Sequence, residues 1–168
     1  MKILVTGRGG TGKSTINKEL VELGYNSLDT DRLPGLAGWQ DLETGLPTKV
    51  DTSGYVDYSK VGWNWNSNVL KGVLAARKDM ILCGSASNQL EFHSLFSRVV
   101  VLTVDEATHR NYLKTRDSDY GKGSAMEDRI IDMQQEFLEQ ALQLGAVAVD
   151  NTRPILEVVS EIVRIAGV

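Results

Sequence analysis

The sequence predicts an α/β fold, a doubly wound sheet of five parallel strands with helices on both faces. Short apolar runs alternate with segments of helical periodicity along the whole chain. These runs are apolar throughout, which is typical of strands that are covered on both faces. The length of 168 residues fits one domain, 1–168, whose core needs no disulfides or metals.

The first half of the chain begins with a strand and a helix. Lys2–Thr6 is rich in β-formers and is followed by glycine, so we expect a buried strand there. Ser14–Leu23 carries apolar residues at helical spacing, and Gly24 stands where a helix C-cap is expected. A strand at 26–28, a helix at 66–77 and a strand at 79–83 follow. The stretch 30–62 lacks periodicity and is rich in turn-forming residues, so no regular element is predicted in it.

The second half continues the alternation of strands and helices. Arg98–Val104 is the strongest strand signal, and we expect this strand at the centre of the sheet. Proline at position 154 begins the last helix, a position that proline favours. The other elements are helices at 88–96, 106–116, 125–144 and 154–166, a strand at 146–149 and a polar loop at 117–124.

Composition excludes several classes of protein. The chain has 18 Lys and Arg against 22 Asp and Glu, a net charge of -4, which argues against a nucleic-acid partner. No apolar run reaches the ~18 residues of a membrane span, so no membrane partner is expected. The N-terminal apolar stretch is too short for a signal peptide, and we expect a cytoplasmic protein. Cys83 is the single cysteine, which excludes an intrachain disulfide and a cysteine-based metal site. The sequence leaves the oligomeric state open.

A glycine-rich loop follows the first predicted strand. Residues 7–15 read Gly-Arg-Gly-Gly-Thr-Gly-Lys-Ser-Thr and match the phosphate-binding pattern G-x-x-x-x-G-K-[ST]. The glycines let backbone N–H groups turn toward an anion, and the following helix adds the positive end of its dipole. In this pattern Lys13 reaches the β- and γ-phosphates, and the hydroxyl of Ser14 ligates Mg²⁺. The residues expected to hold the nucleotide are Gly9, Gly10, Thr11, Gly12, Lys13, Ser14 and Thr15.

The same loop permits a second interpretation. Its glycines also fit the dinucleotide fingerprint G-x-G-x-x-G, with Asp29 or Asp31 near the place of the ribose-binding acid. Lys13 and Ser14 have no role in a dinucleotide site, so the sequence favours a triphosphate.

With this loop and this order of elements, the chain resembles the nucleoside-monophosphate-kinase and shikimate-kinase branch of the P-loop NTPases. The resemblance covers nearly the whole length, and the phosphate loop is its specific part. It implies a three-layer sandwich, ATP and Mg²⁺ as cofactors, and phosphoryl transfer to a small-molecule acceptor such as a nucleotide, a nucleoside or a sugar-like metabolite. It also implies an acceptor-binding segment at about 33–66 and a short lid at about 117–124.

Two aspartates follow the second predicted strand, at the edge of the sheet where ligands bind. The resemblance implies that Asp29 lies near Mg²⁺, beside Ser14, and that Asp31 orients or deprotonates the acceptor. The alternative is a pair of turn or capping residues. The third strand ends in Cys83-Gly84-Ser85, without the acid of motor-type ATPases and without the glycine run of shikimate kinases. We therefore do not expect shikimate as acceptor, but Ser85 can hydrogen-bond another small molecule.

Basic residues precede the predicted lid. Arg110, Lys114 and Arg116 recur at helical spacing, and Lys122 lies between two glycines that can act as hinges. The resemblance implies that Arg116 and Lys122 hold phosphates and that Arg110 contacts adenine or a phosphate. The alternative is a solvated helix face that pairs with neighbouring acids.

The loop after the last strand reads Asp-Asn-Thr-Arg-Pro. The resemblance implies that Arg153 or Pro154 packs against adenine. The alternative is a plain turn capped by Asn151 or Thr152.

The predicted acceptor segment contains all three tryptophans, Trp39, Trp63 and Trp65. They can line a pocket for a polar ring, or fill the core of a small helical subdomain. In an extended backbone, Trp63 and Trp65 point to opposite faces. Arg32 is the best candidate to bind a phosphate of the acceptor. Because basic residues are otherwise scarce here, the sequence favours a neutral or cationic acceptor.

The leading hypothesis is therefore an ATP-dependent kinase with Lys13, Asp31, Arg116 and Lys122 as its catalytic residues. A nucleotide-binding regulatory module or slow ATPase is the second hypothesis, and a polynucleotide kinase is a weaker third. The two histidines, His93 and His109, are expected to be surface or capping residues, because phosphoryl transfer of this type needs no histidine.

Overall fold

The computed structural model describes residues 1–53, 55–115 and 124–167. Its central sheet has five parallel strands in the order β2–β5–β1–β6–β7, which confirms the predicted fold class. The strands are β1 (Lys2–Thr6), β2 (Ser27–Asp29), β5 (Met80–Cys83), β6 (Arg98–Thr103) and β7 (Val147–Asp150).

The middle of the sheet is β1, with β6 next to it. The prediction that the strand at 98–104 takes the central place was therefore wrong by one position. The physical reason is that β6 also has a strand on either side and helices on both faces. Its sequence is as apolar as that of a middle strand for this reason.

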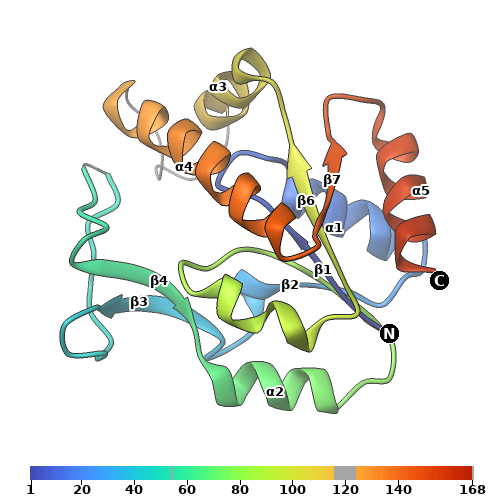
Figure 1. Cartoon of the computed structure of the whole chain (residues 1–168), viewed down its shortest axis with the longest axis horizontal. Helices are drawn as coiled ribbons and strands as arrows, with labels where there is room; N and C mark the ends of the chain where they lie inside the picture. The colour runs from blue at the N-terminus through green and yellow to red at the C-terminus, as the bar shows by residue number, and fades with distance from the viewer. Residues whose placement is uncertain (54, 116–123, 168) are drawn as a thin grey trace.

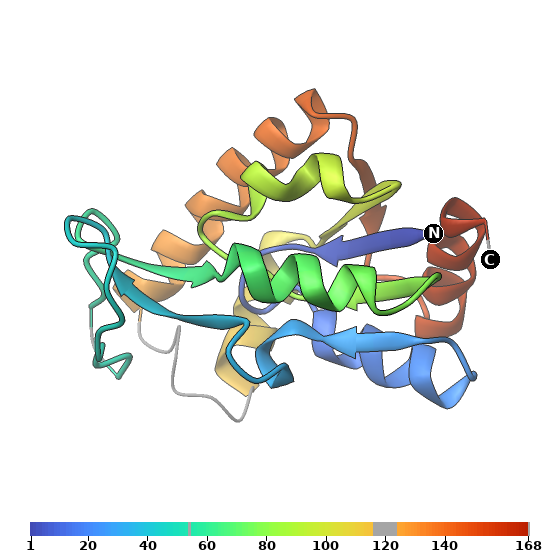
Figure 2. The same cartoon turned by 90° about the horizontal axis from the view of Figure 1, so that it is seen from below.

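Helices cover both faces of the sheet (Figures 1 and 2). One face carries α1 (Lys13–Glu22) and α5 (Ile155–Ala166), whose apolar side chains pack on Ile3 and Val5 of β1. The opposite face carries α2 (Ser67–Ala75), the 3₁₀ segment η2 (Gln89–Leu95) and α4 (Ser124–Gln143), which share a core with Leu4. Successive residues of a strand point to opposite faces, and β1 thus joins both halves of a three-layer sandwich. No helix in the described ranges is both long enough and apolar enough to traverse a lipid bilayer.

An antiparallel hairpin projects from the sandwich and forms its own small sheet (Figure 1). It consists of β3 (Ala37–Asp41) and β4 (Val61–Trp65), with Trp39 opposite Trp63. The prediction that 30–62 contains no regular element is wrong, and so is the alternative of a helical subdomain. Glycine inside each strand and a long connection between them removed the sequence signals of a hairpin.

The outer part of the hairpin packs back against the sandwich. Val56, in the connection between β3 and β4, is buried with Leu113 of α3 (Glu106–Thr115) and with Met126 of α4. Trp39 and Tyr58 pack against the same cluster. The hairpin is therefore held to the body at its tip as well as at its base.

Candidate active site

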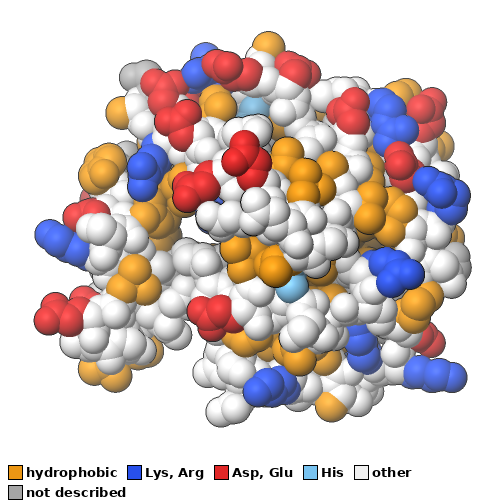
Figure 3. Space-filling view, in the orientation of Figure 1, with side chains coloured by type: hydrophobic (Ala, Val, Ile, Leu, Met, Phe, Trp, Pro, Cys, Tyr) orange, Lys and Arg blue, Asp and Glu red, His pale blue; other side chains and the backbone are white. Residues whose placement is uncertain are grey.

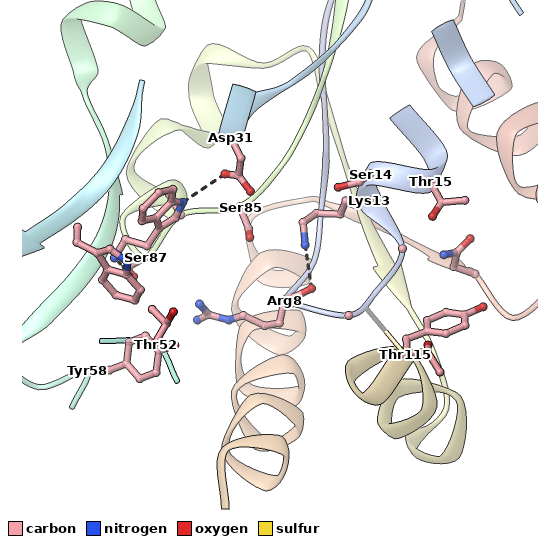
Figure 4. Close-up of a pocket in the computed structure, with 18 of the residues that line it drawn as sticks. Arg8, Lys13, Ser14, Thr15, Asp31, Thr52, Tyr58, Ser85, Ser87 and Thr115 are labelled. Atoms are coloured by element: carbon pink, nitrogen blue, oxygen red, sulfur yellow. Dashed lines mark hydrogen bonds between the residues drawn. The ribbon is translucent and has the colours of Figure 1, made fainter. Parts of the chain in front are cut away.

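A pocket of about 770 Å³ lies between the phosphate loop and the hairpin, at the carboxyl ends of β1, β2 and β5. This volume is in the range of small-molecule sites. The space-filling view shows the surface hollowed between the hairpin, on the left, and the body (Figure 3). Polar side chains from the loop, from Asp31 and from Ser85 converge on it (Figure 4).

The phosphate loop connects β1 to α1 and forms the floor of the pocket. Gly10 and Gly12 have positive φ angles of 81° and 91°, which only glycine adopts without strain. The Lys13 ammonium donates to the backbone carbonyls of Gly7 (2.7 Å) and Arg8 (2.8 Å). Of the predicted nucleotide-binding residues, Gly9, Gly10, Gly12, Lys13, Ser14 and Thr15 line the pocket. Thr11, in the same loop, is buried and does not line the pocket.

Three buried side chains, from elements distant in the sequence, form hydrogen bonds with the backbone of this loop. Asn151 Nδ2 donates to Thr11 O (2.8 Å), the Arg8 N–H donates to Gln134 Oε1 (2.7 Å), and His109 Nε2 lies 2.7 Å from Gly9 O. Since a carbonyl only accepts, the last contact places the proton of neutral His109 on Nε2. A loop held at three points keeps its N–H groups directed at one place.

Both histidines are buried, so the prediction of surface or capping residues was wrong. Burial is the main cause that lowers the pKa of His109, and the nearby Lys13 and Arg110 charges act in the same direction. The hydrogen bond to Gly9 acts in the opposite direction. Burial alone lowers the pKa of His93. Both imidazoles are therefore neutral at pH 7 and serve as packing and hydrogen-bonding groups.

Two oxygen ligands suited to Mg²⁺ lie together beside the loop. Ser14 Oγ is 3.4 Å from Asp29 Oδ2, while Asp29 Oδ1 accepts the backbone N–H of Asp31 at 3.0 Å. A hydroxyl and a carboxylate fit this ion, which keeps several waters and takes its other ligands from phosphates. Burial raises the pKa of the neighbouring Cys83 thiol to about 12, so this residue at the end of β5 supplies no thiolate. In the described ranges, no group of three or more acidic, histidine or cysteine side chains could hold a metal ion.

An aromatic wall, made of Trp39, Tyr58 and Trp63, lines the pocket next to Asp31. The indole N–H of Trp63 donates to Asp31 Oδ1 at 3.3 Å (Figure 4). Trp39 meets Trp63 edge to face, with ring centroids 5.6 Å apart, and lies 6.2 Å from Tyr58. Thr52, Ser85 and Ser87 also line the pocket.

Trp65 does not reach the pocket. It is 2% exposed and packs on Phe92 in the core, as the alternation of β4 requires. Trp39 and Trp63 thus line the pocket, whereas Trp65 fills the main core of the sandwich and not the core of a helical subdomain.

The opposite end of the pocket is formed by Tyr112, Thr115, Asn151, Arg153 and Ile155. Arg153 is held there by an ion pair with Glu161 and by a hydrogen bond from its Nε to Asp150 O (3.2 Å). Pro154 is not among the lining residues.

Two arginines from the sequence analysis lie elsewhere. Arg110 pairs with Glu106 of α3 (2.8 Å) and with Asp128 of α4 (2.7 Å), and these carboxylates raise its pKa. Arg32 is exposed at the end of the short 3₁₀ turn η1 (Thr30–Arg32). Neither lines the pocket. Arg116, Lys122 and most of the expected lid fall outside the described residues.

Sequence reasoning missed several residues of the pocket. Arg8 occupies a variable position of the phosphate motif, so the pattern drew no attention to it. Tyr112 and Thr115 belong to helix α3, where the sequence signal is the spacing of the basic residues and the uncharged positions carry no signal. Asn151 was considered only as a possible turn cap, whereas it lines the pocket and supports the loop.

Comparison with known proteins agrees with this architecture. The sequence model of the AAA domain family matches residues 3–132. No curated protein sequence matches the chain. Shikimate kinase from Acinetobacter baumannii, solved with shikimate, has a similar structure, with a TM-score of 0.64, 17% identity, and coverage of 97% of this chain and 90% of that one.

Two further solved structures are similar over nearly their full length. Deoxyadenosine kinase from M. mycoides has a TM-score of 0.54 and 17% identity, over 98% of this chain and 97% of that one. A gluconokinase from Sinorhizobium meliloti 1021 has a TM-score of 0.54 and 18% identity, over 99% of this chain and 91% of that one. The chain therefore belongs to the AAA domain family and has the fold of the P-loop small-molecule kinases.

Proposed function

We propose that this protein is an ATP- and Mg²⁺-dependent phosphotransferase that acts on a small-molecule acceptor. One observation carries the proposal: Lys13, Ser14 and Asp31 line one pocket that also has an aromatic wall. Asp29 lies next to Ser14, within 3.4 Å of its hydroxyl. A nucleotide-binding module without an acceptor needs the loop, but it has no use for a carboxylate and an aromatic wall beside it.

The phosphate loop and its neighbours would bind the phosphoryl donor, ATP, together with Mg²⁺. The N–H groups of the loop and Lys13 would bind the phosphates of ATP, with Lys13 moving from its two carbonyl partners to the phosphate oxygens. Ser14 and Asp29 would hold Mg²⁺, which supplies charge neutralisation of the phosphates when bound. We assign the nucleoside end to Arg153, with Tyr112 and Ile155 beside it. Arg116 and Lys122 remain proposed phosphate contacts.

Asp31 is the proposed acceptor residue. Its Oδ1 receives the Trp63 N–H, which fixes the direction of the carboxylate. A carboxylate so placed can accept a hydrogen bond from an acceptor hydroxyl and take its proton as the bond to phosphorus forms. Positioning of this kind and stabilisation of charge supply most of the catalysis in phosphoryl transfer.

The test is acceptor-stimulated ADP release, measured with ATP, Mg²⁺ and a panel of small metabolites. We expect Lys13→Ala to lower the stimulated rate by at least about 100-fold, because it removes a cation from the developing charge. Lys18→Ala is the matched control, since Lys18 lies on the same helix and is exposed, with Glu22 as its partner. ADP release that no acceptor stimulates, or a Lys13→Ala variant as active as the control, would contradict the proposal.

A further inference from the structure

The acceptor side of the pocket contains a cation that no sequence feature pointed to. Arg8 belongs to the phosphate loop, yet its side chain runs away from Lys13 toward Thr52 and Tyr58 (Figure 4). Among the described residues that line the pocket, the charged ones are Arg8, Lys13, Asp31 and Arg153. Lys13 faces the carbonyls of the loop and Arg153 lies at the opposite end, so Arg8 is the positive charge next to the aromatic wall.

The position of Arg8 is fixed at both ends. Its backbone N–H donates to Gln134 Oε1 (2.7 Å), and Gln134 Nε2 in turn donates to Leu102 O (3.2 Å). Its guanidinium carbon lies 5.3 Å above the ring of Phe137, which is buried in the core. A cation at this distance from an aromatic face is favourably placed, and the stacking limits the directions that the guanidinium can take. Helix α4, through Gln134 and Phe137, therefore orients Arg8 at the edge of the pocket.

The aromatic wall next to Arg8 favours a ligand that contains a ring. Trp39, Trp63 and Tyr58 are only half-buried, and their ring planes are inclined to one another by 67° and 40°. Large aromatic side chains that remain partly exposed in a cavity gain most by contact with a flat or apolar ligand face. The guanidinium of Arg8 is a planar donor that matches a carboxylate or a phosphate.

We propose that Arg8 is an acceptor-recognition residue, and that the acceptor is a ring-bearing molecule with an anionic group, either a carboxylate or a phosphate. The ring lies on the wall of Trp39, Trp63 and Tyr58, the anionic group on Arg8, and the hydroxyl that receives the phosphoryl group on Asp31. This inference rests on the proposed function for the role of Asp31, but the anion site itself does not depend on turnover. It also reverses the expectation of a neutral or cationic acceptor, which followed from the scarcity of basic residues in 33–66.

A binding experiment tests the anion site without catalysis. Fluorescence excited at 295 nm reports on Trp39 and Trp63 in the pocket, over a constant signal from buried Trp65. The probes are phenyl phosphate with phenol, and benzoate with benzamide, so each anionic ring has a neutral partner. We expect at least one anionic probe to quench the signal at a concentration about tenfold lower than its partner, a difference of roughly 1.4 kcal/mol. The two pairs distinguish a phosphate from a carboxylate.

Two variants assign the effect to Arg8. Arg8→Gln should remove the preference for the anionic probe, and Arg8→Lys should keep part of it, because the charge remains while the planar donor is lost. Arg98→Gln is the matched control, since Arg98 is exposed at the start of β6 and outside the pocket. Near-UV circular dichroism verifies that each variant is folded.

Three results would overturn the inference. The first is equal quenching by both members of each pair, or no quenching by any anionic probe up to about 10 mM, which is weaker than any useful subsite. The second is an Arg8→Gln variant that keeps the preference. The third is an Arg8→Gln variant that loses affinity for a fluorescent ATP analogue alone, which would assign Arg8 to the donor phosphates. Anion-dependent quenching in a protein without acceptor-stimulated ADP release would instead remove the kinase proposal and leave the anion site standing.

Discussion

Gly12 and Asn151 occupy one small space at the base of the phosphate loop. A Cβ atom at Gly12 would collide with Nδ2 of Asn151, the same atom that donates to Thr11 O at 2.8 Å. Gly12 also has a φ angle of 91° and is the N-cap residue of helix α1. At this position the motif therefore requires glycine both for the backbone conformation and for the room that Asn151 needs.

A side chain at a left-handed backbone position costs about 1–2 kcal/mol. Gly12→Ala should therefore lower the free energy of unfolding by more than this amount. Displacing Asn151 leaves the buried Thr11 carbonyl unpaired, which adds roughly 1–3 kcal/mol. Gly24→Ala is the control, because Gly24 has a φ angle of 88° and nothing within 4 Å of the added atom. Urea unfolding should show a larger loss of unfolding free energy for Gly12→Ala, together with weaker ATP binding. Equal losses in the two variants, with unchanged ATP affinity, would contradict this account.

The same residues show which parts of the site a sequence can predict. Lys13, Ser14 and the glycines were predicted because they lie within nine consecutive positions whose chemistry and spacing are specific. The side chains that hold the loop are 100, 126 and 140 residues away from it. A histidine, a glutamine and an asparagine on ordinary elements carry no local signal, since only the tertiary fold brings them to the loop.

At the scale of elements, the hairpin is the part of the molecule that sequence periodicity did not predict. The strands of the main sheet and the helices were predicted because their burial pattern repeats locally. Strands β3 and β4 pair across a long connection, and each has a glycine where a β-former would be expected. Only the alternation around Trp63 and Trp65 was visible, and it gave their opposite directions correctly.

The hairpin is fastened to the sandwich by the loop that follows β5. Asn88 Oδ1 accepts from Trp65 N (2.9 Å), and Asn88 Nδ2 donates to Trp65 O (3.1 Å). Ser87 N donates to Trp63 O (2.6 Å), and Ser87 Oγ accepts from Trp63 N (3.2 Å). These bonds set the place of the aromatic wall relative to Asp31.

Asn88→Ala should loosen this attachment, because it leaves both backbone groups of the buried Trp65 without their partner. We expect a loss of about 1–3 kcal/mol in unfolding free energy and a raised KM for the acceptor, with ATP affinity unchanged. Asn66→Ala is the control: Asn66 caps helix α2 through Asn68 N and Val69 N, so its loss lowers stability by about 1 kcal/mol without touching the wall. A rise in KM that is equal in both variants would show that the effect is general destabilisation.

At the scale of the whole molecule, two buried histidines connect stability to pH. His109 lies between α3 and the phosphate loop, and His93 lies in η2 on the other face of the sheet. Neither ring nitrogen of His93 has a hydrogen-bond partner within the described part of the chain. Burial lowers the pKa of each below its ordinary value of 6.5. Protonation of either histidine therefore destabilises the folded state, and the two histidines lie far apart in the structure.

The sign of the effect follows from proton binding. Below pH 6.5 the unfolded chain takes up protons that the folded chain does not, so the free energy of unfolding falls as the pH falls. The limiting slope is about 1.4 kcal/mol per pH unit for each histidine. Several aspartates, Asp41, Asp51, Asp57, Asp105 and Asp150, have pKa values lowered below 3.8 by hydrogen bonds, so they titrate at more acidic pH. The histidines thus dominate between pH 7 and 5.

Urea unfolding at several pH values from 7.5 to 5.0, in steps of about half a unit, measures this dependence. We expect stability to be level above pH 7 and to decline below pH 6.5. His109→Gln should remove part of the slope while its side-chain amide can still donate to Gly9 O, and His93→Leu should remove the other part. The double variant should be nearly independent of pH in this range, although less stable at pH 7.5. A double variant that keeps the full slope would place the responsible protons on other groups and refute the assignment to these two buried imidazoles.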